Sequence, residues 1–298
     1  MKYKKPSSLL ISFYHYQKER FPIVFLALAT LPVILSSAVV VAQNKLNFLH
    51  IFLILVASLS YLFHIRVVDD YRDFKHDNLY HEDRPVQKGV ISLTNLKKID
   101  IIAAIILLAV AISSNIYGLA IAVFMLIYTY IAEREFFVTK KIRKHFFIYN
   151  AVNLFQMTLL QIFVYNFFFR SFYLNPIIIT HFLLITTGTS MFDFLRKLKT
   201  PHAESTGKDT YTWYFGFRNS LIIYLFFVSL LALLFFVLAN EMILSLGIWL
   251  VIILIFIAIS FLNAYFHWIK KSEMTDKLLQ ANSLFFYGFL NLLIYFLR

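Results

Sequence analysis

Long apolar runs recur along the whole chain, and they constrain the fold more than any other feature. A helix needs about 20 residues to cross a ~30 Å hydrocarbon core. Runs of roughly this length predict nine spans, at residues 21–42, 46–68, 99–117, 118–133, 146–169, 175–195, 219–239, 242–268 and 279–297. Hydrophobic residues make up 60% of the 298 positions and charged residues only 15%, values that soluble domains rarely reach. We therefore predict an all-α, polytopic membrane protein with nine transmembrane helices.

The charge distribution predicts how these spans are oriented. Of the 28 Lys and Arg residues, all but Lys45, Arg170 and Arg298 lie in the N-terminal segment or beside the ends of even-numbered spans. Because loops rich in Lys and Arg stay in the cytoplasm, we expect the N-terminus and the large polar loops there, as in a bacterial inner-membrane protein. The net charge of +12 is then a topological signal, and we expect no nucleic-acid partner.

The lack of polar linkers between the predicted spans indicates a single domain. No long polar segment or Gly/Ser-rich linker interrupts the spans, so residues 1–298 are expected to form a single transmembrane domain. Residues 1–20 are basic and partly amphipathic, typical of a lead-in on the membrane surface. The run after them is long and has no small-residue cleavage site, so we expect a retained span. The chain has no cysteine, which excludes disulfides and thiolate metal sites.

Ionisable residues crowd together directly after the second span. Asp69, Asp73 and Asp77 recur every four residues, a spacing that drifts only about 40° per step on a helix, so the three carboxylates share one face. Three acids on one face repel each other unless a cation lies between them. Mg²⁺ takes one or two carboxylates and gives its other positions to water and substrate phosphates.

Basic residues alternate with these acids, at Arg66, Arg72, Lys75, Arg84 and Lys88. Carboxylates mixed with Lys and Arg are the residue types that a metal-bridged diphosphate requires. The alternative is a solvated helix end in which Arg72 and Lys75 form local ion pairs, while the other cations only set the topology.

A second polar loop follows the sixth predicted span. It begins with Asp193, Arg196 and Lys197, and continues through Glu204 to Lys208 and Asp209. Two charged loops on the same face of the membrane could bind one ligand from opposite sides.

The arrangement of both loops resembles the UbiA-type intramembrane prenyltransferase superfamily. The first motif of that family reads N-x-x-x-D-x-x-x-D, and Asp69, Asp73 and Asp77 match it with Asp in place of the Asn. Arg84-Pro85 and Gly89 match the RP…G turn that follows. The second family motif is D-x-x-x-D, of which Asp193 matches the first acid while Lys197 replaces the second. The resemblance covers nearly the whole chain.

The resemblance implies nine helices around a central cavity that is open to the membrane. It also implies Mg²⁺-dependent transfer of an isoprenoid from an allylic prenyl diphosphate to a hydrophobic or aromatic acceptor in the lipid bilayer. The implied catalytic acids are Asp69, Asp73, Asp77 and Asp193, which also bind Mg²⁺, with Asp209 or Glu204 completing the metal site. The implied diphosphate-binding residues are Arg72, Arg84, Lys88, Arg196, Lys197, Lys140 and Tyr128.

Lys197 leaves other functions open. An ammonium group cannot bind Mg²⁺, but it can contact a diphosphate directly. One alternative is a terpene cyclase, which ionises the prenyl diphosphate and uses no acceptor. Another is a transporter or non-catalytic membrane protein. Transporters commonly place ionisable residues near the bilayer midplane, whereas here the charges gather at the ends of the spans.

Overall fold

The computed structural model describes residues 8–42, 47–134, 146–169, 175–201, 204 and 210–298. Every regular element in these residues is a helix, so the predicted all-α class is confirmed. The helices are α1 (Leu9–Arg20), α2 (Ile23–Ala42), α3 (Phe48–Arg72), α4 (Phe74–Tyr80), α5 (Leu93–Ser114), α6 (Ile116–Glu133), α8 (Phe146–Phe168), α9 (Pro176–Arg196), α10 (Tyr211–Phe215), α11 (Phe217–Glu241), α12 (Ile248–Lys270) and α13 (Glu273–Leu297).

The long helices lie where the sequence predicts spans. Eight of them within the described residues are long and apolar enough to cross a membrane, namely α2, α3, α6, α8, α9, α11, α12 and α13. The ninth prediction, 99–117, corresponds to α5, which has 22 residues but carries Lys97, Lys98 and Asp100 in its first turns. The chain is an integral, multi-pass membrane protein.

Asparagine and serine side chains determine where several helices begin. The side chains of Ser92, Asn115 and Asn175 each accept a hydrogen bond from a backbone N–H in the first turn of α5, α6 and α9. These bonds satisfy N–H groups that have no partner inside the helix. Asn115 alone separates α5 from α6, which agrees with the very short turn predicted near residues 115–118, although the predicted spans met two to three residues later.

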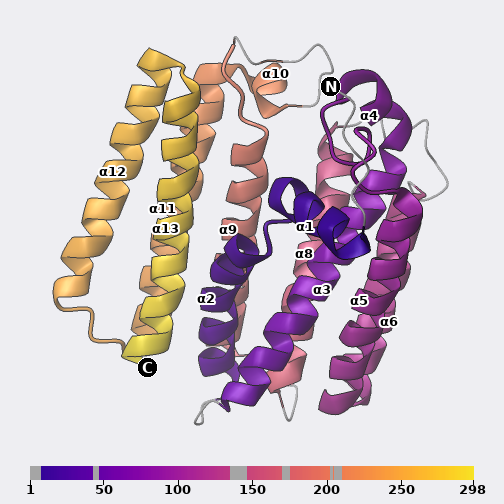
Figure 1. The fold of residues 1–298 in the computed structure, drawn as a ribbon. Helices are drawn as coiled ribbons and strands as arrows, with labels where there is room; N and C mark the ends of the chain where they lie inside the picture. Colours follow the sequence, from indigo (N-terminus) through magenta and orange to yellow (C-terminus); the bar gives the residue numbers. More distant parts are fainter. Residues whose placement is uncertain (1–7, 43–46, 135–145, 170–174, 202–203, 205–209) are drawn as a thin grey trace. The chain divides into compact units, whose positions relative to one another are not determined.

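The chain divides into two compact units, which we describe separately. Unit 1 comprises residues 1–34 and 45–169, and unit 2 comprises residues 35–44 and 170–298, so that α2 passes from one to the other. In unit 1, α3 packs against α5, α6 and α8 (Figure 1). With 25 residues, α3 is about 37 Å long. It therefore exceeds a ~30 Å hydrocarbon core by more than a turn, which allows its charged end to lie outside the hydrocarbon.

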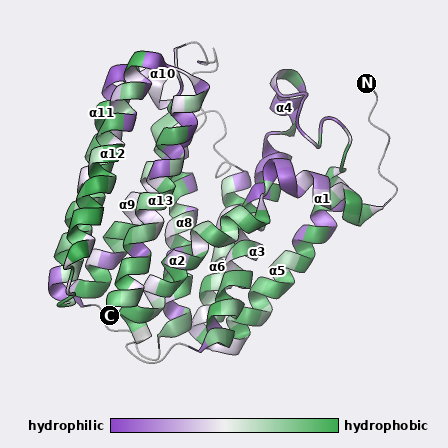
Figure 2. Cartoon of the chain, turned by 60° about the vertical axis from the view of Figure 1, so that its left-hand side comes forward, coloured by the Kyte–Doolittle hydropathy of each residue, from purple (hydrophilic) through white to green (hydrophobic). Residues whose placement is uncertain are grey.

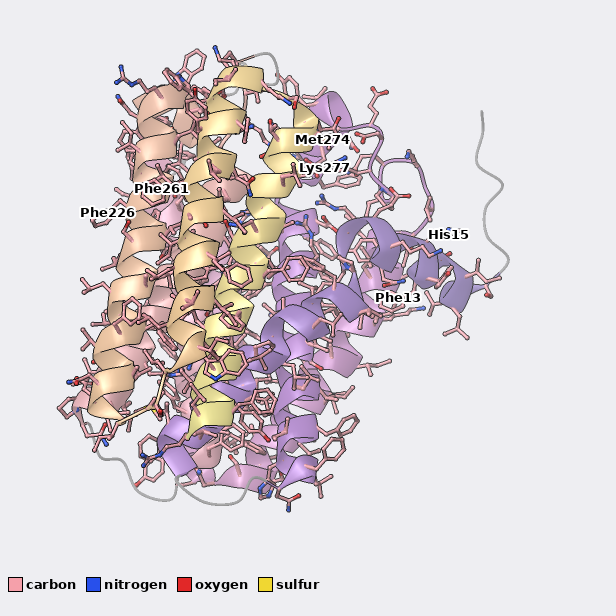
Figure 3. All side chains as sticks on the ribbon, turned by 90° about the vertical axis from the view of Figure 1, so that its left-hand side faces the viewer. Phe13, His15, Phe226, Phe261, Met274 and Lys277 are labelled. Atoms are coloured by element: carbon pink, nitrogen blue, oxygen red, sulfur yellow. The ribbon has the colours of Figure 1, made fainter. Side chains whose placement is uncertain are left out.

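In unit 2, α11 packs against α9 and α12, and α13 packs against α12 (Figure 1). Large apolar side chains point outward from these helices, as Figure 3 shows for Phe226 on α11 and Phe261 on α12, which are 62% and 45% exposed. Such faces suit contact with lipid tails. On the inner side, Ser36 donates a hydrogen bond to Asn291 at 2.6 Å and lies 3.0 Å from the His181 ring nitrogen.

Gly188 allows α9 and α13 to approach closely. A Cβ atom built on Gly188 would lie 2.2 Å from Cε2 of Tyr287, a side chain that is only 5% exposed. The run Thr186-Thr187-Gly188-Thr189-Ser190 therefore has the small-residue character that membrane helices use for close packing.

We predict that Gly188→Ala destabilises unit 2, because the added methyl group would overlap a buried aromatic ring. Overpacking of this kind costs about 1–3 kcal/mol. The measurement is thermal unfolding of the purified protein in detergent. Leu183→Ala is the control, since Leu183 lies on the same helix and is 48% exposed. Equal melting temperatures for Gly188→Ala and the wild type would contradict the close approach.

Candidate functional site

The acidic segment at the end of α3 follows a nearly continuous helical path. The N–H of Asp73 donates to the carbonyl of Asp69 at 2.9 Å, and the N–H of Asp77 donates to the carbonyl of Asp73 at 2.8 Å. Asp73 lies between α3 and α4. Figure 2 shows hydrophilic residues gathered at α4. The three acids therefore occupy consecutive turns, as their spacing predicts.

Arg72 joins the first two acids. Its guanidinium lies 2.7 Å from Asp69 and 3.2 Å from Asp73, and its side chain is only 7% exposed. The ring of Tyr149 on α8 lies 5.1 Å from the guanidinium carbon, a cation–π contact that fixes the position of the charge. The two carboxylates are more accessible, at 24% and 31% exposed. One buried cation thus compensates two acids that face solvent.

Asp77 has different partners. Its carboxylate is 3% exposed and forms an ion pair with Arg84. The N–H of Lys88 donates to the Arg84 carbonyl at 2.9 Å, and the N–H of Val90 donates to the Pro85 carbonyl at 2.9 Å. Gly89 has a φ of +74°, a conformation that favours glycine. The predicted RP…G segment is therefore a real turn, which brings Arg84 to Asp77 and leaves the Lys88 side chain exposed.

The structure reveals a buried ionic network at Asp70, which the sequence analysis did not identify. The Asp70 side chain is 4% exposed and accepts hydrogen bonds from Tyr16 at 2.6 Å, Arg20 at 2.8 Å and Arg66 at 2.5 Å. Burial, together with the Asp70 carboxylate, raises the pKa of the Tyr16 hydroxyl above its usual range, so this group stays a hydrogen-bond donor.

The Asp70 network attaches α1 to the acidic end of α3. Tyr16 is fully buried and packs with Phe63, Val67, Ile91 and Leu96 in one apolar cluster. This cluster lies beneath both the end of α3 and the turn that carries Arg84. The pairing of Arg66 with Asp70 could have been predicted from the sequence, because residues four positions apart lie on one helix face. Nothing in the sequence indicated that Tyr16 and Arg20 join them.

The second acidic segment lies in unit 2. The Asp193 carboxylate is 11% exposed and lies 2.9 Å from Arg196 and 3.0 Å from Lys197. The Tyr211 hydroxyl donates to it at 3.3 Å. Lys197, which replaces the second acid of the family motif, therefore forms an ion pair with the first acid. The structure thus brings together three of the predicted site residues of this segment, Asp193, Arg196 and Lys197.

Two further predicted residues, Tyr128 and Glu204, each form a hydrogen bond within one unit. The Tyr128 hydroxyl donates to the Val152 carbonyl at 3.1 Å, which connects α6 to α8, and the Glu204 carboxylate accepts a hydrogen bond from Thr210. Lys140 and Asp209 lie outside the described residues. Their roles, and the participation of Asp193 in one site with Asp69 and Asp73, stay predictions.

Several solved structures share the fold of this chain, and two of them are named UbiA homologues. The chain matches a UbiA homologue from Aeropyrum pernix K1 in its apo state, with a TM-score of 0.66 and 15% identity over 88% of this chain and 96% of that one. It also matches a structure of digeranylgeranylglyceryl phosphate synthase in membranes, with a TM-score of 0.62 and 19% identity over 95% and 97%.

A third similar structure is a UbiA homologue from Archaeoglobus fulgidus bound to DMAPP and Mg²⁺, with a TM-score of 0.54 and 16% identity over 95% of this chain and 99% of that one. No family model and no curated protein sequence matches the chain. The chain therefore has the UbiA-type fold over nearly its whole length, and the resemblance noted in its motifs is confirmed at the level of the fold.

We predict that Asp70→Asn destabilises unit 1 strongly, because it removes the buried negative charge that Arg20 and Arg66 share, and leaves these two half-buried cations without their partner. Removing one member of a buried ion pair costs about 3–5 kcal/mol. Thermal unfolding in detergent is the measurement.

The matched control is Lys277→Gln, which breaks an ion pair between Lys277 and Glu273 whose side chains are 73% and 81% exposed. We expect Lys277→Gln to leave the melting temperature nearly unchanged, since exposed ion pairs add little stability. If both variants melt at the wild-type temperature, the Asp70 network does not stabilise the fold.

Proposed function

We propose that the protein is an intramembrane prenyltransferase, which moves an isoprenoid from an allylic prenyl diphosphate to a hydrophobic or aromatic acceptor. The observation that carries this proposal is the accessible pair Asp69 and Asp73, which share the buried Arg72 within a UbiA-type fold. One similar structure holds DMAPP and Mg²⁺, which supports the same kind of ligand here.

The donor set fits Mg²⁺. Carboxylate oxygens are the ligands that this hard cation prefers, and it keeps positions for water and phosphate oxygens. Asp69 and Asp73 are partly exposed, so their carboxylate oxygens can bind a metal ion in place of part of their contact with Arg72. We propose them as metal ligands in unit 1, and Asp193 as a metal ligand in unit 2. When bound, Mg²⁺ supplies Lewis-acid stabilisation of the negative charge on the leaving diphosphate.

Basic side chains of the chain bind the diphosphate directly in this proposal. Arg72 lies against Asp69 and Asp73, Arg84 lies against Asp77, and Lys88 is exposed on the same turn as Arg84. As the bond between the allylic carbon and the diphosphate oxygen breaks, its electron pair leaves with the diphosphate. Guanidinium and ammonium donors stabilise that developing charge. The allylic carbon then bonds to the acceptor, which loses a proton.

The apolar helices protect the reactive carbon. An allylic cation in water is quenched to an alcohol, so the transfer requires surroundings from which water is excluded. Long apolar helices supply such surroundings, and aromatic faces stabilise a cation. An acceptor positioned there traps the cation, whereas without one the same ionisation yields a cyclised or hydrolysed product.

We expect Asp73→Ala to reduce turnover of farnesyl or geranylgeranyl diphosphate by about 100-fold or more, the scale seen when one group that stabilises transition-state charge is removed. The measurement is mass spectrometry of products from purified protein with Mg²⁺ and candidate acceptors. Terpene formed without an acceptor would favour the cyclase. Asp83→Ala is the matched control, because Asp83 is an exposed acid in the turn after α4. Full activity of Asp73→Ala would contradict the site.

Lys197→Asp tests how the unusual second motif works. Lys197 forms an ion pair with Asp193, so the change replaces a cation by a second acid and restores the D-x-x-x-D pattern. If Lys197 replaces a metal ion, we expect turnover by Lys197→Asp to depend more strongly on Mg²⁺ than turnover by the wild type. Lys199→Asp, in the same segment, controls for net charge. An unchanged Mg²⁺ titration would show that Lys197 does not stand in for a metal ligand.

A further inference from the structure

The short helix α4 brings two histidines to a buried carboxylate. His76, Asp77 and His81 each offer one ligand atom, and these three atoms lie within 4.8 Å of one another. The N–H of His81 donates to the Asp77 carbonyl at 2.9 Å, so one helical turn separates these residues. Side chains four residues apart lie on one helix face, which is the spacing that helical zinc sites use.

The distances are close to those that a metal ion requires. Zinc binds His nitrogen and carboxylate oxygen at about 2.0–2.2 Å in a tetrahedron, so its ligand atoms lie about 3.3 Å apart. Nδ1 of His76 already lies 3.6 Å from Oδ1 of Asp77. The His76 and His81 ring centroids are 5.8 Å apart. An ion at this position would draw the ligand atoms, now within 4.8 Å of one another, closer together.

Asp77 is oriented for this role by Arg84. Arg84 contacts Oδ2 of Asp77, whereas Oδ1 is the oxygen nearest to His76. The Asp77 carboxylate can therefore bind an ion through Oδ1 while Oδ2 stays paired with Arg84. Hydrogen-bonded partners behind a ligand orient it in this way in known metal sites. The Asp77 carboxylate is 3% exposed and the His76 ring 53% exposed, so an ion has a fixed anchor and an open approach from solvent.

We propose that His76, Asp77 and His81 bind a divalent transition-metal ion of the zinc type, with water in the fourth position. Two imidazoles and one carboxylate favour Zn²⁺ or Co²⁺ over Mg²⁺, which prefers oxygen ligands. The site uses nitrogen ligands that the proposed Mg²⁺ chemistry at Asp69 and Asp73 does not need. Binding here also engages Arg84 through Asp77, which connects the ion to the turn at residues 84–89.

The test is direct binding to the full chain in detergent, produced without a polyhistidine tag and kept in excess Mg²⁺. Calorimetric titration with Zn²⁺ should show one saturable ion per chain. His76→Gln and His81→Gln should each weaken that affinity by at least about 10-fold, the scale on which losing a metal ligand or its supporting group acts. His15→Gln is the matched control, because His15 is an exposed histidine on α1 (Figure 3) and should leave the affinity unchanged.

A second variant identifies the ligand directly. The chain contains no cysteine, so His81→Cys provides a single thiol, and Co²⁺ bound to it should give a sulfur-to-cobalt charge-transfer absorption that the wild type lacks. The proposal is overturned if Zn²⁺ does not saturate a site, if its affinity survives in His76→Gln/His81→Gln, or if folded His81→Cys gives no such absorption. Neither readout requires turnover, so a negative result here leaves the prenyltransferase proposal standing.

Discussion

The structure of unit 1 depends on how negative charge is compensated where an apolar helix ends. Four aspartates lie within the last turn of α3 and the segment after it, and each has a guanidinium partner. Arg72 contacts Asp69 and Asp73, Arg84 contacts Asp77, and Arg20 and Arg66 contact Asp70. Carboxylates next to a hydrocarbon region would otherwise carry a large desolvation cost. Arginine suits this position because it stays charged and donates several hydrogen bonds.

Exposure separates these acids into two kinds. The Asp70 side chain is 4% exposed and Asp77 is 3% exposed, so their ion pairs hold the surrounding segments together. Asp69 and Asp73 are 24% and 31% exposed, so a ligand can reach them. The buried ion pairs thus help to position the accessible acids. Asp70 is hydrogen-bonded to α1, and the preceding residue in the chain, Asp69, pairs with Arg72.

Much of this was predictable from the sequence because it depends on local patterns. Apolar runs gave the positions of the long helices, and the spacing of Asp69, Asp73 and Asp77 gave their consecutive turns. The bounds of the third predicted span were less accurate, because α5 runs from residue 93 to residue 114 rather than from 99 to 117, with the charged residues Lys97, Lys98 and Asp100 inside its first turns. The Asp70 network was not predictable, because Tyr16 and Arg20 meet Asp70 across 54 and 50 residues. Spacing within one helix carries no information about such contacts.

We propose that carboxylates at the end of α3 hold a diphosphate through Mg²⁺. The most direct measurement is calorimetric binding of an unreactive prenyl thiodiphosphate to the purified protein, with and without Mg²⁺. We expect that tight binding requires Mg²⁺ and is lost in Asp69→Asn/Asp73→Asn while the protein stays folded. Equally tight binding in the presence of a chelator, or undiminished Mg²⁺-dependent binding by the double variant, would contradict it.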